Sequence, residues 1–350
     1  MQGGQQGHVL SQFNSYQMTT IIPDGELFAH AERAKGKVVV LTGGGNGIGK
    51  EVALTFSKHG AKVVIGDVDV SGAEAVVAAI NKPGGEAVSI GCNVVNWDDQ
   101  LALFELAFER YGAVDIVIPN AGISENEHGV CSGELTVVDG KPVAPKLATL
   151  GVNLTGVFYT VHLGMHYIQR NRAPDSWKAI VMMGSIASWQ GIPRAPQYSA
   201  SKHGVLGLMR ALDPIVSGDN IRIAVIHPWF ADTSILGLPV KILLAGLPMT
   251  PVSRIAGAVF RAATDPDAAT NGCPWVLPDD GPVIRVEKEA LRVGVYEMLE
   301  KRLRRANGFG SAVRDWARLA RDLCRILSPA LSIAAVAAVL AVSFSGRFAI

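Results

Sequence analysis

The stretch of sequence that decides the fold runs from residue 42 to residue 49 and reads Thr42-Gly43-Gly44-Gly45-Asn46-Gly47-Ile48-Gly49. It follows a β-branched run, residues 38–41, and leads into residues 48–56, where apolar side chains recur at helical spacing. A pyrophosphate needs a close backbone approach without Cβ atoms and free N–H groups at a helix N-terminus. Although glycines also serve in plain turns, this context predicts a strand–turn–helix unit that binds a dinucleotide.

The same alternation of strand and helix patterns continues to about residue 280. Short, almost wholly apolar strands are expected at residues 62–65, 87–90, 116–118, 179–182, 223–226 and 275–277. Apolar strands separated by helices are typical of a parallel sheet that is covered on both faces. The sequence therefore predicts an α/β fold, a Rossmann-like doubly wound parallel sheet that forms a single domain over residues 36–285.

Composition excludes several other classes of protein. Lys and Arg number 32 against 31 Asp and Glu in 350 residues, so the net charge of +1 gives no field that would attract nucleic acid. The hydrophobic fraction of 49% excludes disorder as the global state. The cysteines form no C-x-x-C pair and have no histidine at ligand spacing, so we expect no metal site, no disulfide framework and a reducing compartment; they are Cys92, Cys131, Cys273 and Cys324.

An acidic residue follows the second expected strand. Asp67 lies eighteen residues after Gly49, where a carboxylate can accept hydrogen bonds from both ribose hydroxyls and repel a 2′-phosphate. Asn46 occupies the glycine turn, so no cation stands there to hold such a phosphate. The carboxylate at position 67 and the lack of a cation at position 46 together favour NAD over NADP. The alternative is that Asp67 is only a solvated carboxylate at the end of a strand and binds no cofactor.

A tyrosine and a lysine lie four residues apart, at Tyr198 and Lys202. Side chains at i and i+4 are neighbours on one helix face. A phenol titrates near 10, and a nearby cation favours the phenolate and so lowers that pKa. The pair could therefore form an acid/base site, although a half-buried tyrosine beside a solvated lysine would give the same spacing.

These motifs occur together and in order, and the sequence resembles the short-chain dehydrogenase/reductase family of the TGxxxGxG, Y-x-x-x-K type over about residues 36–280. The matching positions are Thr42, Gly43, Gly47, Ile48, Gly49, Asn120, Ala121, Gly122, Asn153, Ser185, Tyr198 and Lys202. The amino-acid sequence of residues 223–230 is also similar to that of fungal dehydrogenases of secondary metabolism.

The resemblance implies a catalytic tetrad of Asn153, Ser185, Tyr198 and Lys202. In it, Tyr198 exchanges a proton with the substrate oxygen, and Ser185 hydrogen-bonds that oxygen where charge develops. Lys202 lowers the pKa of Tyr198 and holds the nicotinamide ribose, while Asn153 keeps a water in a proton relay.

The resemblance also implies a set of cofactor-binding residues: Thr42, Gly43, Asn46, Gly47, Ile48, Gly49, Asp67, Asn93, Val94, Asn120, Ala121, Gly122, Tyr198, Lys202 and Thr233. Three positions depart from the family pattern. Pro119 replaces an asparagine, and Asn93 replaces an aspartate but can still contact the adenine amino group. Trp229 replaces a glycine, so we expect the local loop path to differ from that of the family and a large aromatic ring to lie where nicotinamide and substrate meet.

Residues 230–251 are mostly apolar, and Trp189 and Ile192 follow Ser185. This predicts a pocket for a bulky hydrophobic alcohol or ketone, although helix packing alone would give the same pattern. We expect an enzyme that acts on CH–OH groups with NAD as acceptor, interconverting a secondary alcohol and a ketone. The alternatives are an NADP-dependent ketone reductase, a catalytically silent NAD-binding regulator and a scaffold. The resemblance further implies a homodimer or homotetramer through the helices that bear Asn153 and Tyr198.

The ends of the chain differ from its middle. Residues 1–35 are expected to form a flexible tail and residues 286–325 a basic helical extension. Residues 326–345 carry no charge and would span about 30 Å as a helix, enough to cross a membrane. The positive-inside bias of the arginines at 314, 318, 321 and 325 would keep the catalytic domain cytosolic. The alternative is a soluble cytoplasmic protein in which this helix packs internally.

Overall fold

The computed structural model describes residues 19–125, 137–171 and 176–288, together with residues 302, 316, 320 and 321. Its contacts divide the chain into two units, Met1–Val293 and Gly294–Ile350, and the first of them contains the sheet and the helices that cover it. Within the described residues a nine-stranded sheet has the order β1-β11-β10-β9-β8-β5-β2-β3-β4. Seven of its strands are mutually parallel: β2 (Val38–Thr42), β3 (Lys62–Asp67), β4 (Glu86–Gly91), β5 (Ile116–Pro119), β8 (Lys178–Met183), β9 (Ile221–Pro228) and β10 (Pro274–Leu277).

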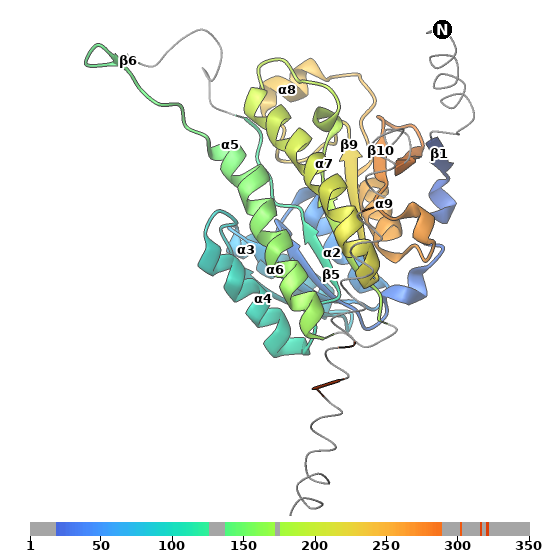
Figure 1. Ribbon diagram of the computed structural model, residues 1–350. Helices are drawn as coiled ribbons and strands as arrows, with labels where there is room; N and C mark the ends of the chain where they lie inside the picture. The colour runs from blue at the N-terminus through green and yellow to red at the C-terminus, as the bar shows by residue number, and fades with distance from the viewer. Residues whose placement is uncertain are drawn as a thin grey trace, which may run out of the picture. The chain divides into compact units, whose positions relative to one another are not determined.

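Helices cover both faces of this sheet (Figure 1). One face carries α2 (Gly47–Lys58), α3 (Val70–Asn81) and α9 (Val252–Thr264), and the other carries α4 (Trp97–Tyr111), α6 (Gly156–Arg170) and α7 (Pro196–Val216). Successive side chains of β2 point to opposite faces of the sheet. Val39 and Leu41 pack in the cluster that includes α2, whereas Val38 and Val40 pack in the cluster that includes α4. Both faces of the strand are buried, which explains its unbroken run of apolar residues. The predicted doubly wound parallel sheet is confirmed.

The strand order reverses at β2, which lies between β3 and β5. The carboxyl ends of β2 and β5 therefore meet at a topological switch point, where open α/β sheets bind their ligands. The glycine turn follows β2 and residues 120–125 follow β5. The fold thus brings these two predicted cofactor segments together.

Two antiparallel strands extend the sheet beyond the predicted last strand. β11 (Val283–Val286) pairs with β10, and β1 (Thr19–Ile22) pairs with β11. The 3-10 helices η1 (Asp24–Glu26) and η2 (Ala31–Ala34) come next in the chain after β1, and Leu27 between them is buried. Residues 19–34, expected in a flexible tail, therefore form part of the folded unit. The pairing partner of β1 lies at the other end of the domain, so no local pattern indicated it.

The remaining elements are short. They comprise the hairpin β6 (Val137–Val138) and β7 (Lys141–Pro142), α5 (Ala148–Leu150), the π-helix η3 (Gly151–Thr155), η4 (Ile186–Ser188), η5 (Ser217–Asp219), α8 (Leu238–Leu243) and η6 (Ala268–Thr270). Asn153 lies on a helix, as expected, and this helix starts before Asn153, at α5. Its first turns, α5 and η3, include a π-helical segment that contains Asn153.

The prediction of a C-terminal membrane anchor has to be corrected. In the part of the chain that the structure describes, no helix is long and apolar enough to cross a membrane. Residues 326–345, to which the prediction referred, lie outside that part, as does most of the expected extension at 286–325. The pattern was weak evidence, because a charge-free stretch rich in alanine and serine gains little free energy on insertion. The added C-terminal hydrophobic helix is therefore not retained.

Candidate active site

The glycine turn closes tightly after β2. Gly43 and Gly47 have φ values of 68° and 52°, in the left-handed region that favours glycine. A Cβ atom on Gly49 would collide with the carbonyl oxygen of Gly43, and one on Gly43 would lie 2.7 Å from the Cα atom of Ala121. The turn therefore needs glycine at both places, and it presents bare backbone at the start of α2.

Asn120 joins this turn to the loop after β5. Its Nδ2 atom donates to the carbonyl oxygens of Thr42 at 3.0 Å and Gly43 at 2.8 Å. In return, the hydroxyl oxygen of Thr42 accepts the backbone N–H groups of Asn120 and Ala121 at 3.1 and 3.2 Å. Pro119, which departs from the family pattern, is buried as the last residue of β5 and lies opposite Thr42. The replacement leaves this connection intact.

Asp67 lies at the end of β3, across from the glycine turn. Its Oδ2 atom accepts the backbone N–H of Gly45 at 2.7 Å, and its Oδ1 atom accepts that of Asp69 at 2.9 Å. These bonds hold the buried carboxylate beside the turn. Asn93 and Val94, which are predicted to bind the adenine end of the cofactor, come after β4. The Asn93 side chain is exposed, and its oxygen accepts the backbone N–H of Val95 at 3.3 Å.

Asn153 is fully buried in the π-helical segment. Its carboxamide pairs with the main chain of Ile123 in both directions, each bond being 2.9 Å long. Single π turns are rare and occur mostly at functional sites. The side chain thus fixes the loop after β5 against the start of α6.

Ser185 and Tyr198 are brought together from two elements. Ser185 follows β8 and caps η4, where its Oγ accepts the N–H of Ala187 at 3.2 Å. A side-chain hydrogen bond with Ser185 lowers the pKa of the Tyr198 phenol, but burial has the larger effect and raises that pKa above its ordinary value. The phenol is therefore hydrogen-bonded to the Ser185 side chain, as the chemistry that the family resemblance implies requires.

Lys202 lies one turn beyond Tyr198 on α7. Its Nζ atom donates to the carbonyl oxygen of Met183 at 2.9 Å and stands 5.6 Å from the centroid of the Tyr198 ring. Burial lowers the pKa of this ammonium to about 8. The expected lowering of the Tyr198 pKa by Lys202 is not what the structure shows, because burial of the phenol dominates and the ammonium faces the ring and a carbonyl.

Sequence reasoning missed two residues at this site. His227, at the end of β9, is fully buried and its Nδ1 lies 3.1 Å from the carbonyl oxygen of Ser185. Burial lowers its pKa to about 3, so its ring is neutral. Glu125 accepts the backbone N–H of Tyr198 through Oε2 at 3.0 Å. Neither contact had a local signal, because the partners lie 42 and 73 residues apart.

Residues 230–251 lie beside the glycine turn at one end. A Cβ atom on Gly47 would lie 3.5 Å from Thr233, and the Ser234 hydroxyl donates to Asn46 Oδ1 at 3.0 Å. Further along, Leu238 and Ile242 are 71% and 67% exposed. Apolar side chains that this segment leaves in water are available to a hydrophobic ligand.

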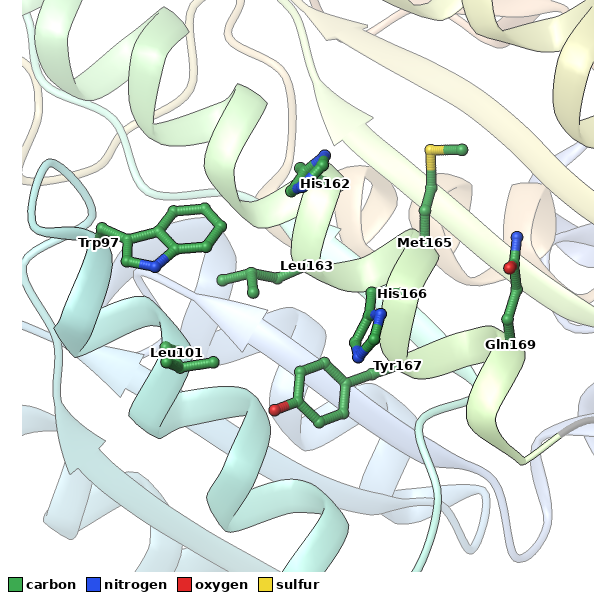
Figure 2. A pocket seen from close by; sticks show the side chains of 8 residues that line it. All are labelled: Trp97, Leu101, His162, Leu163, Met165, His166, Tyr167 and Gln169. Atoms are coloured by element: carbon green, nitrogen blue, oxygen red, sulfur yellow. The ribbon is translucent and has the colours of Figure 1, made fainter.

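A groove of about 450 Å³ separates α4 from α6 (Figure 2). Its lining includes Trp97, His162, Met165 and His166, and none of these is a predicted site residue. The rings of Trp97 and His162 lie 6.0 Å apart. Among the described residues, no group of three or more His, Cys, Asp or Glu side chains could hold a metal ion.

Comparison with known proteins places this geometry in a family. The family described as short chain dehydrogenase matches residues 37–238. A short-chain dehydrogenase/reductase of Acremonium egyptiacum is 32% identical over 253 residues, which cover 71% of this chain and 80% of the relative. The 5′-hydroxyaverantin dehydrogenase of Dothistroma septosporum is 30% identical over 59% of this chain and 71% of its own.

A solved structure agrees with these sequence matches. The 3-ketoacyl-(acyl-carrier-protein) reductase of Brucella melitensis, complexed with NADH, superposes with a TM-score of 0.60 and 26% identity, covering 70% of this chain and 97% of the other. The predicted resemblance is therefore confirmed. The fold is one that binds a nicotinamide cofactor, and the relatives are oxidoreductases that act on CH–OH groups. The chain belongs to the short-chain dehydrogenase family.

Proposed function

We propose that this protein is an NAD-dependent oxidoreductase that interconverts a secondary alcohol and a ketone on a bulky hydrophobic substrate. The observation that carries the proposal is the contact between the Tyr198 phenol and Ser185, with the Lys202 ammonium one helical turn away. The names of the relatives, one a dehydrogenase and one a ketoacyl reductase, support exchange between alcohol and ketone. The exposed leucine and isoleucine of α8 support an apolar substrate.

The residues present fit a dinucleotide. The glycine turn packs so closely that a Cβ atom at Gly43 or Gly49 would collide with the protein's own backbone, so the turn presents bare main chain at the start of α2, and Asp67 lies beside it with a buried carboxylate. Asn120, Ala121 and Gly122, with Thr233, would complete the cofactor site, as would Asn93 and Val94 at the adenine end. When bound, NAD supplies the acceptor for the hydride that leaves the alcohol carbon.

The side chains would then handle the proton. Tyr198 takes the proton of the substrate hydroxyl during oxidation and returns it during reduction. Ser185 hydrogen-bonds the same oxygen as its charge changes. Lys202 would hold the ribose, and Asn153, already bonded to Ile123, would keep a water of the relay in place.

Tyr198→Phe tests this assignment. The substitution removes only the proton-carrying oxygen and leaves the ring packing, so turnover should fall to less than about 1% of wild type, in line with the 10²–10⁴-fold contribution of general acid–base catalysis. NADH binding, measured by fluorescence, should survive because the glycine turn is unchanged. Hydrophobic secondary alcohols and ketones would be screened at the nicotinamide absorbance. Wild-type protein that binds NADH but turns over none of them would instead indicate a silent regulator or a scaffold.

The cofactor preference rests on Asp67. Asp67→Ser should weaken NAD and relieve the repulsion of the 2′-phosphate, so the ratio of kcat/KM for NAD to that for NADP should fall by about tenfold or more. The same ratio measured with Asp69→Ser, a neighbouring and more exposed carboxylate, is the matched control. A wild-type enzyme that prefers NADP would contradict the proposal and favour the NADP-dependent reductase.

A further inference from the structure

The helix that carries Tyr198 lacks a cap of its own. α7 starts at Pro196 after Ala195, whose side chain makes no capping hydrogen bond. Backbone N–H groups in the first turn of a helix have no partner within the helix and need an acceptor from elsewhere. The N–H of Tyr198 finds one in Glu125, whose Oε2 accepts it at 3.0 Å. The cap thus comes from 73 residues earlier in the chain.

The loop that supplies Glu125 also contacts the other parts of the site. Asn120 binds the main chain of the glycine turn at Thr42 and Gly43. Ile123 pairs with the carboxamide of the buried Asn153. Residues 120–125 therefore contact the cofactor turn, the π-helical segment and the first turn of α7.

A second contact holds the same turn of α7. The Nε2 atom of Gln197, which is buried beside Tyr198, donates to the carbonyl oxygen of Lys146 at 3.0 Å. This contact reaches only the neighbouring residue, and Glu125 is the described side chain that accepts the backbone N–H of Tyr198. A carboxylate at this end of a helix also interacts favourably with the helix dipole.

We propose that Glu125 is a positioning residue: its carboxylate fixes the first turn of α7 against residues 120–125 and so sets where the Tyr198 phenol meets the substrate. The inference rests on the proposed function, because it takes Tyr198 as the acid/base. A reacting group that is misplaced by about 1 Å can cost about 100-fold in rate. Loss of the cap should therefore lower kcat rather than cofactor affinity.

Three substitutions at one position separate hydrogen bonding from charge. Glu125→Gln keeps an oxygen acceptor at the same reach without the charge, and should retain kcat within about threefold. Glu125→Ala removes the acceptor and should lower kcat by about 10- to 100-fold, with the NADH dissociation constant within about twofold. Glu125→Asp keeps the charge but is one methylene shorter, and should resemble alanine. The solvent isotope effect on kcat should rise in the alanine and aspartate variants, because proton transfer becomes more rate-limiting.

A matched control removes a cap far from Tyr198 in the sequence. Asp267 caps η6 through the N–H of Ala269 at 2.8 Å, so Asp267→Ala should lower the melting temperature with kcat unchanged. Two results would overturn the positioning role: wild-type kcat in Glu125→Ala, or a glutamine variant as impaired as alanine while aspartate is active. If Glu125→Ala fails to fold, the glutamine and aspartate pair decides the matter. A Tyr198→Phe enzyme that stays active would refute the proposed function and not the positioning role of Glu125. The two failures can therefore be told apart.

Discussion

Burial of the Lys202 ammonium, which the proposed chemistry requires, should lower the stability of the folded protein. The residue is 5% exposed, and burial alone accounts for an ammonium pKa lowered to about 8. A charge removed from water is destabilising unless it is well paired, and here the partner is the Met183 carbonyl. A residue kept for its charge would therefore reduce stability at neutral pH.

Lys202→Met should reveal this loss of stability, because the variant has no ammonium to bury. The folded pKa of about 8 lies below the ordinary value of 10.5, so the unfolded chain binds more protons between these two pH values. Wild-type stability should therefore rise with pH across that window, while the cost, on the order of 3 kcal/mol, is fully present below pH 8. Loss of the bond to Met183 would offset about 1 kcal/mol of the gain in the variant.

The measurement is denaturant unfolding of both proteins from about pH 7 to about pH 10. The free energy of unfolding of Lys202→Met, relative to wild type, should be highest at the low end and decline toward the high end. Lys58→Met, at an exposed lysine of α2, should show no such trend. If the difference in free energy of unfolding between Lys202→Met and wild type does not change with pH, the ammonium is not a buried group with a lowered pKa. The variant should also lose turnover and cofactor affinity.

At the scale of elements, the N-terminal strand determines where the folded unit begins. β1 covers the edge of β11, and Ile22 and Leu27 are buried against the core. The guanidinium of Arg254 on α9 binds Asp24 with an N–O distance of 2.8 Å and donates to the Asp280 carbonyl. The N-terminal segment is therefore joined to both the sheet and a helix.

Two truncations test this boundary. Removing residues 1–18 should change the melting temperature little. Removing residues 1–35 exposes the edge of β11 and loses the burial of Ile22 and Leu27, about 1.5 to 3 kcal/mol each. At this size the melting temperature should fall by roughly 10 °C or more. Equal melting temperatures for the two truncated chains would show that β1 contributes nothing.

At the scale of the whole folded unit, one helical face is incompletely covered. Phe158 and Trp97 are 48% and 38% exposed, and the spacing of Phe158, His162 and Met165 places them on one side of α6. Trp97, His162 and Met165 line the groove (Figure 2). Surface aromatic residues gathered in this way mark interaction sites. The face belongs to α6, which follows Asn153, and the family resemblance implies association of copies through this helix and α7, which bears Tyr198.

We therefore predict that two copies associate through α4 and α6. Phe158→Glu would place a charge in the contact and should convert dimers or tetramers into smaller species by sedimentation or light scattering. Val138→Glu in strand β6, which is 56% exposed and lies outside α4, α6 and α7, is the control. A monomeric wild-type protein, or an unchanged assembly in Phe158→Glu, would refute this interface.

Much of the fold was determined by short-range sequence pattern. The parallel strands, the glycine turn and the spacing of Tyr198 and Lys202 follow from periodicity and from the steric needs of a few adjacent residues. Because both faces of the sheet are buried, its strands are unbroken apolar runs that can be recognised without knowing their neighbours. Gly49 is a similar case, since its need for a missing Cβ arises within the turn itself.

Only the tertiary structure decided the contacts between distant segments. The pairing of β1 with β11, the cap that Glu125 provides for Tyr198 and the bond of Asn153 to Ile123 join residues separated by at least 30 positions. No local propensity reports such partners, because their free energy is gained only when the fold brings them together. The pKa of Tyr198 has the same origin: sequence spacing predicted a lowering by Lys202, whereas burial, which depends on all surrounding elements, raised it.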